Sequence, residues 1–469
     1  MIPQRFAPVL QELAPLAAVF SKAGKRAYLV GGSVRDLMLD RSTASLDFDL
    51  TTDARPDEVK SLVGGWADAV WTPGERFGTI ACRKGERTYE ITTHRAEAYV
   101  PDSRKPDVQF ADDVTVDLSR RDFTVNAMAL EITSDSPTLV DPFGGMSDLM
   151  SKVLRTPLSP TVSFSDDPLR MMRAARFIAA LSLEPEAELV AAVKALRDRL
   201  EIVSAERIRN ELDRLIVTDH PTMGLWFLVE TGLAEKFFPE LPAMKLEQDP
   251  IHRHKDVLTH TFAVVENVRP DASDDFDFRI TRLAALFHDI GKPKTRAYQE
   301  GKGVSFHHHE VVGARMSRQR LKALKYSTED VEAITELVAL HLRFHTYQMG
   351  WSDSAVRRYV RDAGPLLNEL NVLTRCDCTT RNEKKALMLS RRMDDLESRI
   401  AELAKKEELA ALRPELDGQQ VMEHLGIAPG REVGRALEFL MEIRLEEGLL
   451  GDDAIRRRLD EWWKDHNKA

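Results

Sequence analysis

The stretch that decides the fold runs from residue 27 to residue 36 and reads Ala-Tyr-Leu-Val-Gly-Gly-Ser-Val-Arg-Asp. Its apolar start predicts a short strand, and Gly31-Gly32 predicts a tight turn into a helix. Glycines allow backbone N–H groups to approach phosphate oxygens closely, and a helix N-terminus favours negative charge. Arg35, one turn into the helix, can add a charge-assisted contact. The stretch is a candidate phosphate site, and a purely structural turn explains its glycines equally well.

Two aspartates flank a phenylalanine about ten residues further on, in Leu46-Asp-Phe-Asp-Leu50. On a strand, Asp47 and Asp49 project from one face while the phenylalanine turns into the core. Two carboxylates this close need a cation, and Mg²⁺ binds one or two carboxylates together with substrate phosphates. Glu90, on a later predicted strand, is a candidate third carboxylate. A solvated sheet edge is the alternative for the aspartate pair taken alone.

Around these motifs, the first part of the chain reads as mixed α/β and the remainder as helical. From Asp166 onward, apolar residues recur every three or four positions, as amphipathic helices require. Nine of the thirteen histidines fall between His252 and His345, which marks a separate chemical unit. We therefore expect an α+β fold, with a small mixed sheet followed by helical segments. The predicted strands are 27–30, 79–83, 89–92 and 127–132.

The composition limits the class of protein. At 469 residues, with 43% hydrophobic and 30% charged residues, the chain can bury a large core in about two to four domains. No apolar run reaches the ~18 to 20 residues of a membrane span, so we expect neither an anchor nor a signal peptide. Three cysteines cannot form a disulfide framework, which favours the cytoplasm. A net charge of −10 argues against coating nucleic acid by bulk charge but leaves a local RNA-binding surface open.

A third unusual string reads Ser119-Arg-Arg-Asp-Phe-Thr-Val-Asn-Ala-Met128. The adjacent Arg121 and Asp122 offer a donor and an acceptor suited to a ribose and its phosphates. A surface salt bridge with a helix cap is the alternative interpretation.

Five motifs taken together resemble class II CCA-adding tRNA nucleotidyltransferases and the related bacterial poly(A) polymerases. They occur in the order found in that family and cover about the first half of the chain. The motifs are Gly-Gly-Ser-Val-Arg-Asp at 31–36, Asp-Phe-Asp at 47–49, Arg-Arg-Asp-Phe-Thr-Val-Asn-Ala-Met at 120–128, Val-Asp-Pro-Phe-Gly-Gly at 140–145, and Asp-Asp-Pro-Leu-Arg-Met-Met-Arg-Ala-Ala-Arg-Phe at 166–177.

The resemblance implies a role for each matching residue. The glycine turn and Arg35 would hold a triphosphate, and the aspartate pair would bind catalytic magnesium. Arg121 and Asp122 would recognise the ribose. The incoming base would face residues of the last motif, namely Asp167, Arg170, Arg173 and Arg176.

The spacing of this last motif is physically reasonable, since positions 167, 170 and 173 wind around one side of a helix. The alternative is that Arg173 and Arg176 only pair with acids across the neck. One departure is visible, because the family usually has Glu-Asp where this chain has Asp166-Asp167. Residues 94–110 are polar and interrupted by prolines, so we expect a mobile loop beside the site.

A second constellation resembles the H…HD…D order of HD-domain hydrolases. It consists of His260, the pair His288-Asp289 and Asp377, with His309 and His341 standing where dinuclear members supply further ligands. Imidazole and carboxylate ligands from several helices can close a divalent site that activates water on a phosphate. We expect a transition metal or Mg²⁺ there, with phosphodiesterase or phosphatase activity, or a retained scaffold.

The resemblance implies a nucleotidyltransferase head at 1–144, a helical neck and body at 145–250, an HD domain at 251–400 and an RNA-binding tail at 401–469. The implied partners are tRNA, CTP and ATP, with neither DNA nor a membrane. The implied reaction adds CCA to the tRNA 3′ end with release of pyrophosphate, using two magnesium ions. Three alternatives stay open: a poly(A) polymerase, an A-adding tRNA nucleotidyltransferase, and a stand-alone HD-type phosphohydrolase.

Overall fold

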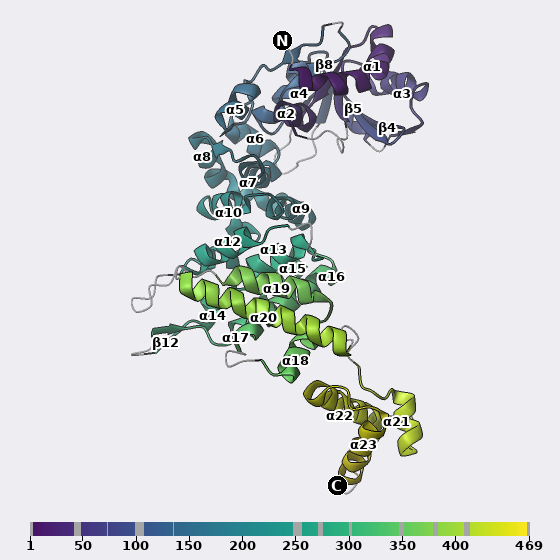
Figure 1. The fold of residues 1–469 in the computed structure, drawn as a ribbon. Coiled ribbons are helices and arrows are strands. Elements are labelled where there is room, and N and C mark those ends of the chain that lie inside the picture. The colour runs from purple at the N-terminus through teal and green to yellow at the C-terminus, as the bar shows by residue number, and fades with distance from the viewer. Residues whose placement is uncertain are drawn as a thin grey trace. The chain divides into compact units, whose positions relative to one another are not determined.

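The computed structural model describes residues 3–41, 48–72, 74–98, 107–134, 136–246, 256–270, 275–299, 303–346, 351–378, 383–407 and 413–466. The chain divides into two compact units, Met1–Pro239 and Glu240–Ala469 (Figure 1). Among the described residues, no helix combines the length and hydropathy that a membrane crossing requires. The α+β class is confirmed, whereas the four-part division at residues 144, 250 and 400 stays a prediction.

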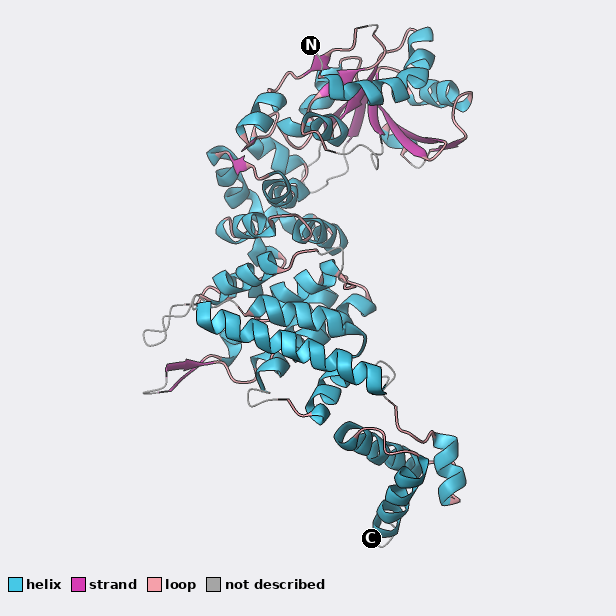
Figure 2. Cartoon of the chain, viewed as in Figure 1, coloured by secondary structure: helices cyan, strands magenta, loops and turns pink. Residues whose placement is uncertain are grey.

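A mixed seven-stranded sheet forms the centre of the first unit, in the order β3-β4-β5-β2-β1-β8-β9 (Figure 2). β2 and β5 run parallel, and the other neighbours run antiparallel. The predicted strands are present, although the last is shorter than expected. Their bounds are β1 (Ala27–Val30), β2 (Phe48–Thr52), β3 (Ala69–Trp71), β4 (Thr79–Lys84), β5 (Arg87–Thr93), β8 (Ala129–Glu131) and β9 (Leu139–Val140).

β1 is an interior strand between β2 and β8 and is buried along its whole length, which explains its unbroken apolar run. Tyr28 and Val30 share one face and pack against Val114 and Leu118 of α4 (Val114–Ser119). Because β1 leads directly into α2 (Gly32–Met38), the packing of this strand fixes the glycine turn at the sheet edge. The other helices of this part are α1 (Ala7–Lys22) and α3 (Pro56–Gly64).

The segment expected to be a loop at 94–110 contains a two-stranded hairpin instead. β6 (Arg95–Ala98) pairs antiparallel with β7 (Asp107–Phe110), with Arg95 opposite Phe110. The expectation was wrong for these strands because backbone pairing does not require apolar side chains. Residues 99–106, the centre of the expected mobile loop, lie outside the described residues.

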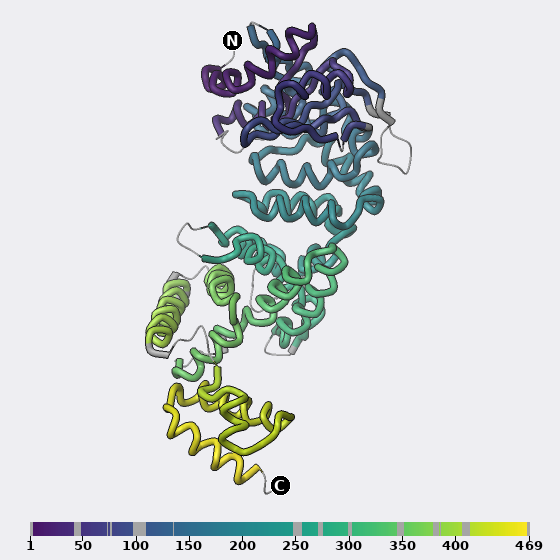
Figure 3. Tube along the Cα trace, turned by 90° about the vertical axis from the view of Figure 1, so that its right-hand side faces the viewer, coloured from purple at the N-terminus to yellow at the C-terminus, as the bar shows by residue number. Residues whose placement is uncertain are grey.

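Short helices follow the sheet within the first unit and stack in layers (Figure 3). The helical geometry is interrupted between α6 (Pro160–Asp166) and α7 (Leu169–Leu181) at Asp167, which is extended with φ −133° and ψ 98°. A residue before proline disfavours helical geometry, and Pro168 follows. Asp167 therefore does not lie on the same helix as Arg170, although the spacing of the two residues had suggested that it would. The other helices here are α5 (Gly145–Ser151), α8 (Ala187–Leu196), α9 (Ala205–Ile216) and α10 (Pro221–Glu230).

The second unit is built around α13 (Phe278–Phe287), whose residues 280–287 are all buried. It packs against α12 (Val257–Asn267), α16 (Thr328–Leu340) and α19 (Leu367–Asp377). α15 (His309–Ala323) packs on α16, and α18 (Asp353–Ala363) packs on α16 and α19. Between α13 and α15, the chain forms a short hairpin of β12 (Ala297–Gln299) and β13 (Gly303–Ser305).

A long helix rich in charged residues, α20 (Glu383–Glu407), follows α19 in the chain. The last helices share a small core of their own: α21 (Gly418–Leu425), α22 (Arg431–Glu447) and α23 (Asp452–His466). α21 ends at Gly426, whose φ of 65° lies in the left-handed region that glycine adopts readily.

Candidate active site and metal centre

Three segments far apart in sequence converge at the glycine turn that follows β1. Gly31 has φ +70°, and a Cβ atom there would lie 3.1 Å from Arg121 Nη1 and 3.9 Å from Asp49 Oδ2. A side chain would therefore strain the backbone and crowd Arg121. The structure brings the glycine turn, the second aspartate and the arginine–aspartate string together at one point.

Asp49 and Glu90 are register partners on the parallel strands β2 and β5. Both are exposed, whereas the residues that flank them, Phe48, Leu50, Tyr89 and Ile91, are buried. Because side chains alternate along a strand, the two carboxylates lie on the same face of the sheet. Oxygen ligands from adjacent strands fit a hard cation such as Mg²⁺. Asp47 lies outside the described residues, so its part in this site stays a prediction.

The Arg35 guanidinium is held on two sides. Its Nε and Nη2 donate to the two carboxylate oxygens of Asp36, each at 2.9 Å. Its Nη1 donates to Asn126 Oδ1 at 2.5 Å. Arg35 thus links α2 to Asn126, which lies in the same string as Arg121 and Asp122.

Asp117, on α4, is a buried carboxylate that sequence analysis missed. It accepts from Arg120 Nη2 at 2.6 Å and from Arg121 Nη2 at 3.0 Å. Burial acts to raise the pKa of Asp117, but the two arginine charges outweigh it and lower the pKa to about 2. Asp117 is therefore ionised at neutral pH and orients Arg121 toward Gly31.

Asp122 is almost fully buried and uses both carboxylate oxygens. Oδ1 accepts from Asn126 Nδ2 at 3.0 Å, and Oδ2 accepts from Arg173 Nε at 2.8 Å and Nη2 at 2.5 Å. Burial acts to raise the pKa of Asp122, but the charge of Arg173 and the hydrogen bonds outweigh it, so its pKa lies below the usual range. Asp122 is a charged link between the head and α7.

Two arginines of α7, Arg173 and Arg176, pair with acids, and their contacts with the nucleotide stay a prediction. Arg176 Nε donates to Glu211 Oε2 at 2.7 Å, and Arg173 contacts Asp122 and Glu211. Arg170 is buried, and it donates to Ser163 Oγ at 2.8 Å and to the Arg120 carbonyl at 2.5 Å.

A pocket in the first unit is lined in part by Arg121, Asp166 and Arg170. Asp167 Oδ2 lies 3.8 Å from Arg207. Two of the predicted nucleotide-binding arginines therefore face one concave surface of the first unit.

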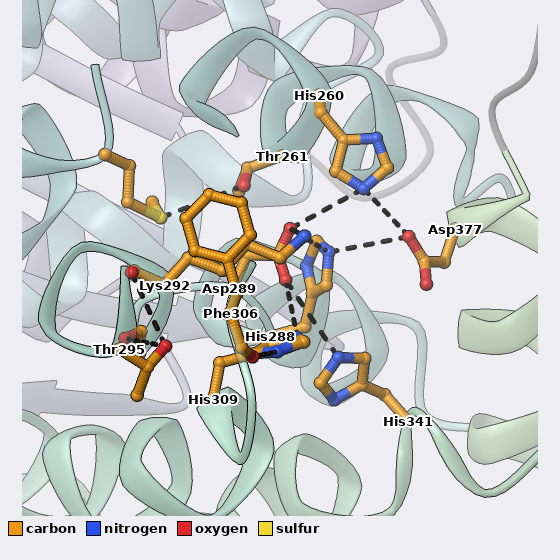
Figure 4. Close-up of polar contacts among 12 residues, drawn as sticks. His260, Thr261, His288, Asp289, Lys292, Thr295, Phe306, His309, His341 and Asp377 are labelled. Carbon is orange, nitrogen blue, oxygen red and sulfur yellow. Dashed lines mark hydrogen bonds and ion pairs between the residues drawn. The ribbon is translucent and has the colours of Figure 1, made fainter. Parts of the chain in front are cut away.

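Five histidine and aspartate side chains converge in the second unit, together with His341, the residue that directly follows α16 (Figure 4). Asp289 lies at their centre: its Oδ2 is 3.2 Å from His288 Nε2 and 3.6 Å from His260 Nε2, and its Oδ1 is 3.3 Å from His309 Nε2. His260 Nε2 also lies 2.8 Å from Asp377 Oδ1. The structure thus brings together all six residues predicted for this centre.

Three of the histidines are oriented by backbone carbonyls. The Nδ1 atoms of His288, His309 and His341 lie 2.7, 2.8 and 2.7 Å from the carbonyls of Ala285, Phe306 and Val338. A carbonyl only accepts, so each Nδ1 must carry the proton and each Nε2 points inward. This is the tautomer that metal-binding histidines adopt.

The inward-facing atoms fit a metal. Within the described part of the chain, the Nε2 atoms of His288, His309 and His341 and Oδ1 of Asp289 are buried without a hydrogen bond. An unpaired buried polar atom costs about 1–3 kcal/mol, which a bound cation would offset. Burial and the neighbouring His288 charge lower the pKa of His341 to about 3, so its imidazole is neutral and able to ligate.

Two ligand groups share Asp289. His260, His288 and Asp289 form one, and Asp289, His309 and His341 form the other. A carboxylate common to two groups fits a dinuclear centre with Asp289 between the ions. Lys292 Nζ lies 2.7 Å from Asp289 Oδ2 and was not singled out from the sequence.

Three parts of the chain match models of known protein families. Residues 27–155 match the Poly A polymerase head domain, and residues 182–244 match the probable RNA and SrmB- binding site of polymerase A. Residues 257–409 match the HD domain.

The A-adding tRNA nucleotidyltransferase of Deinococcus radiodurans is 35% identical over 436 residues, covering 89% of this chain and 91% of the relative. The chain belongs to the tRNA nucleotidyltransferase family. Within this family, the CCA-adding enzyme of Lactobacillus helveticus is 40% identical over 222 residues, which cover 47% of this chain and 53% of the relative. The chain is accordingly a nucleotidyltransferase.

Solved structures of the family share the fold. The CCA-adding enzyme of Bacillus stearothermophilus in complex with CTP matches with a TM-score of 0.67 and 23% identity, covering 100% of both chains. The Thermotoga maritima CCA-adding enzyme complexed with tRNA matches with a TM-score of 0.61 and 18% identity, covering 98% of this chain and 96% of that one.

The predicted nucleotide site of this nucleotidyltransferase is only partly assembled from direct contacts. Gly31, Asp49 and Arg121 meet, and Asp122 meets Arg173. Three further side chains hold these residues: Asp117 pairs with Arg121, Asn126 donates to Asp122, and Glu211 lies beside Arg173. Glu211 lies 35 residues from Arg176 in the chain, so no local spacing reveals that the two side chains pair.

Proposed function

We propose that this nucleotidyltransferase adds C, C and A to the 3′ end of tRNA, using CTP and ATP and releasing pyrophosphate. The observation that carries the proposal is the meeting of Gly31, Asp49 and Arg121 at one sheet edge, within reach of one phosphate chain. The names of the CCA-adding and A-adding relatives support it.

Each group in the head has a role in this proposal. Asp49 and Glu90, with Asp47, would hold two magnesium ions, which supply positive charge to the reacting phosphate and its leaving group. The backbone at Gly31 and Gly32 leaves space for phosphate oxygens. The guanidinium groups of Arg35 and Arg121, held by carboxylates, would share their remaining donors with the triphosphate.

The neck would hold the rest of the nucleotide. Asp122 accepts from the ribose, and Asp167 with the α7 arginines Arg170, Arg173 and Arg176 presents hydrogen-bond groups to the base. These side chains take the place of a nucleic-acid template, because a carboxylate and guanidinium groups can distinguish the edges of cytosine and adenine. The helical body and tail would bind tRNA in the cytoplasm by shape and phosphate contacts.

An A-adding enzyme is the second candidate, because the Deinococcus radiodurans relative, 91% of which this chain matches, bears that name. A tRNA transcript that lacks its 3′ end, incubated with Mg²⁺ and labelled CTP, ATP or both, distinguishes the candidates. We expect C-C with CTP alone and C-C-A with both. Addition of A only to a transcript ending in C-C would identify an A-adding enzyme, and long A tracts a poly(A) polymerase.

We further propose that the HD domain is a divalent-metal phosphohydrolase acting on phosphates at RNA ends. The buried, unpaired Nε2 atoms that face Asp289 support this proposal. His260, His288, Asp289 and Asp377 would hold one ion and His309 and His341 would complete a second; bound there, the ions would lower the pKa of water.

Phosphate release from an RNA oligonucleotide with a 2′,3′-cyclic phosphate, measured with Mn²⁺, Ni²⁺ or Mg²⁺ and with EDTA, tests this second activity. We expect release that depends on the metal. The absence of release with every metal would leave a scaffold role for this domain.

A further inference from the structure

A buried carboxylate on α9 has no role in the proposed reaction. Glu211 is 5% exposed, and its Oε2 accepts from Arg176 Nε at 2.7 Å. Its Oε1 lies 3.6 Å from Arg173 Nη1. A carboxylate is expensive to bury, so its position between two arginines is tightly specified.

The guanidinium of Arg173 is shared between two acids. Glu211 faces its Nη1, whereas Asp122 accepts from its Nε and Nη2. Asp122 thus contacts Glu211 only through Arg173, and any movement of that guanidinium changes what Asp122 can offer a ligand.

The same chain of contacts continues to α2. Asn126 donates to Asp122 at 3.0 Å and accepts from Arg35 at 2.5 Å. The neck ion-pair network therefore runs without a break from α2 to α9, through Arg35, Asn126, Asp122, Arg173, Glu211 and Arg176.

One aromatic ring touches all three guanidinium groups of this network. The guanidinium carbons of Arg35, Arg173 and Arg176 lie 5.3, 5.6 and 4.2 Å from the centroid of Phe177. These distances fall within the ~6 Å of a cation–π contact. Phe177 is itself buried against Phe123, so the three cations have one fixed surface in common.

We propose that Glu211 is a positioning residue that couples ribose recognition to base recognition, because it pairs with Arg176 and also holds the Arg173 guanidinium that pairs with Asp122. This inference rests on the proposed function, which assigns Asp122 to the ribose and the α7 arginines to the base. Glu211 does not touch the nucleotide. Its loss should nevertheless change selection at the ribose, on the far side of Arg173.

The test compares Glu211→Ala and Glu211→Gln in the full chain with the control Glu201→Ala. Glu201 is an exposed acid of the same unit and pairs with Lys236 at 3.0 Å. Binding of CTP and dCTP, measured by calorimetry, gives the ribose selectivity without requiring turnover. Kinetics of addition then give KM and kcat for nucleotide and for tRNA.

In Glu211→Ala, we expect the CTP-to-dCTP affinity ratio to fall about 2- to 30-fold, the range of coupling through one contact network. The KM for nucleotide should rise while the KM for tRNA stays unchanged. Glu211→Gln keeps an acceptor for Arg176 and should recover part of the ratio, and Glu201→Ala should resemble the wild type.

A wild-type ratio in both Glu211 variants would overturn the inference. So would a wild-type chain that binds CTP and dCTP equally, or an equal rise in the KM for tRNA. If Glu211→Ala fails to fold, the nearly isosteric Glu211→Gln still decides. A chain that selects CTP over dCTP but adds nothing to tRNA contradicts the proposed function instead.

Discussion

The nucleotide site of the head and the metal centre of the HD domain are both built from charged side chains, but these differ in what they contact. In the head, Arg121 pairs with Asp117 and Arg173 pairs with Asp122. In the HD domain, the Nε2 atoms of His288, His309 and His341 are buried with no hydrogen bond among the described residues.

This difference distinguishes two ways of preparing a site. Paired guanidinium groups are already oriented and can share spare donors with an extended anion, so the site keeps its shape without ligand. Unpaired ligating atoms are costly to bury and gain a partner only when a cation arrives. The nucleotide site of the head should therefore keep its structure without a nucleotide, whereas the HD domain should be more stable to unfolding with a bound metal ion than without one.

The largest effect expected is on metal content. Because Asp289 belongs to both ligand groups, Asp289→Ala should lose both ions, whereas His309→Ala and His260→Ala should each lose one. Inductively coupled plasma mass spectrometry of the full chain, dialysed after loading with Mn²⁺, measures this.

His308→Ala is the matched control, since the His308 side chain is 83% exposed and lies outside both ligand groups. It should keep both ions. Retention of metal by Asp289→Ala would show that Asp289 does not bridge the centre.

The next effect concerns Phe177, the ring that contacts Arg35, Arg173 and Arg176. Phe177→Ala should destabilise the protein by about 3–5 kcal/mol, the usual cost of removing a buried phenylalanine. The control Phe227→Ala removes a comparably buried ring on α10. Urea unfolding should give similar losses for the two variants, with weakened CTP binding only for Phe177→Ala; equal CTP binding would deny Phe177 a role in the site.

A smaller effect distinguishes strain from crowding at the glycine turn. Gly31 and Gly24 have φ +70° and +69°, but a Cβ at Gly24 would meet no atom within 4 Å. Alanine at either position should cost about 1–3 kcal/mol in backbone strain, since both glycines have positive φ and Gly31, with ψ −134°, lies outside the left-handed helical region. Only Gly31→Ala should raise the KM for nucleotide, because it displaces Arg121. Equal KM values for the two variants would remove Gly31 from the phosphate site.

The smallest effect is a pH dependence of stability in the head. The pKa of Asp117 is about 2 in the folded chain, below the unfolded value of ~3.9. A lowered pKa stabilises the folded state above ~pH 4, and this stabilisation is lost as pH falls toward 2. The free energy of unfolding, measured with urea at pH 5 and pH 3, should therefore fall by about 1 kcal/mol more in the wild type than in Asp117→Asn. Equal pH dependence would contradict the ion pairs.

Local patterns and the order of motifs predicted part of the structure. The apolar run at 27–30 predicted β1, and the order of His260, His288-Asp289 and Asp377 predicted the HD centre through its resemblance to HD-domain hydrolases. The family was also identifiable from the order of its motifs, and the comparisons confirm it.

Contacts between distant segments were not predictable in the same way. Asn126 meets Arg35 across 91 residues, and Arg173 meets Asp122 across 51, so no local period reveals either pair. The break at Asp167 did have a local signal in Pro168, which the spacing argument overlooked. The hairpin at β6 and β7 had none, because its pairing uses backbone groups.

The most direct test of two separate sites is a crossed assay of Asp49→Ala and Asp289→Ala beside the wild type. Each protein is given tRNA lacking its 3′ end, to measure nucleotide addition, and RNA with a 2′,3′-cyclic end, to measure phosphate release. We expect Asp49→Ala to lose addition by about 10³-fold or more while it keeps phosphate release, since metal charge contributes several kcal/mol. Asp289→Ala should show the reverse. A single substitution that abolishes both activities in a folded chain would contradict the account.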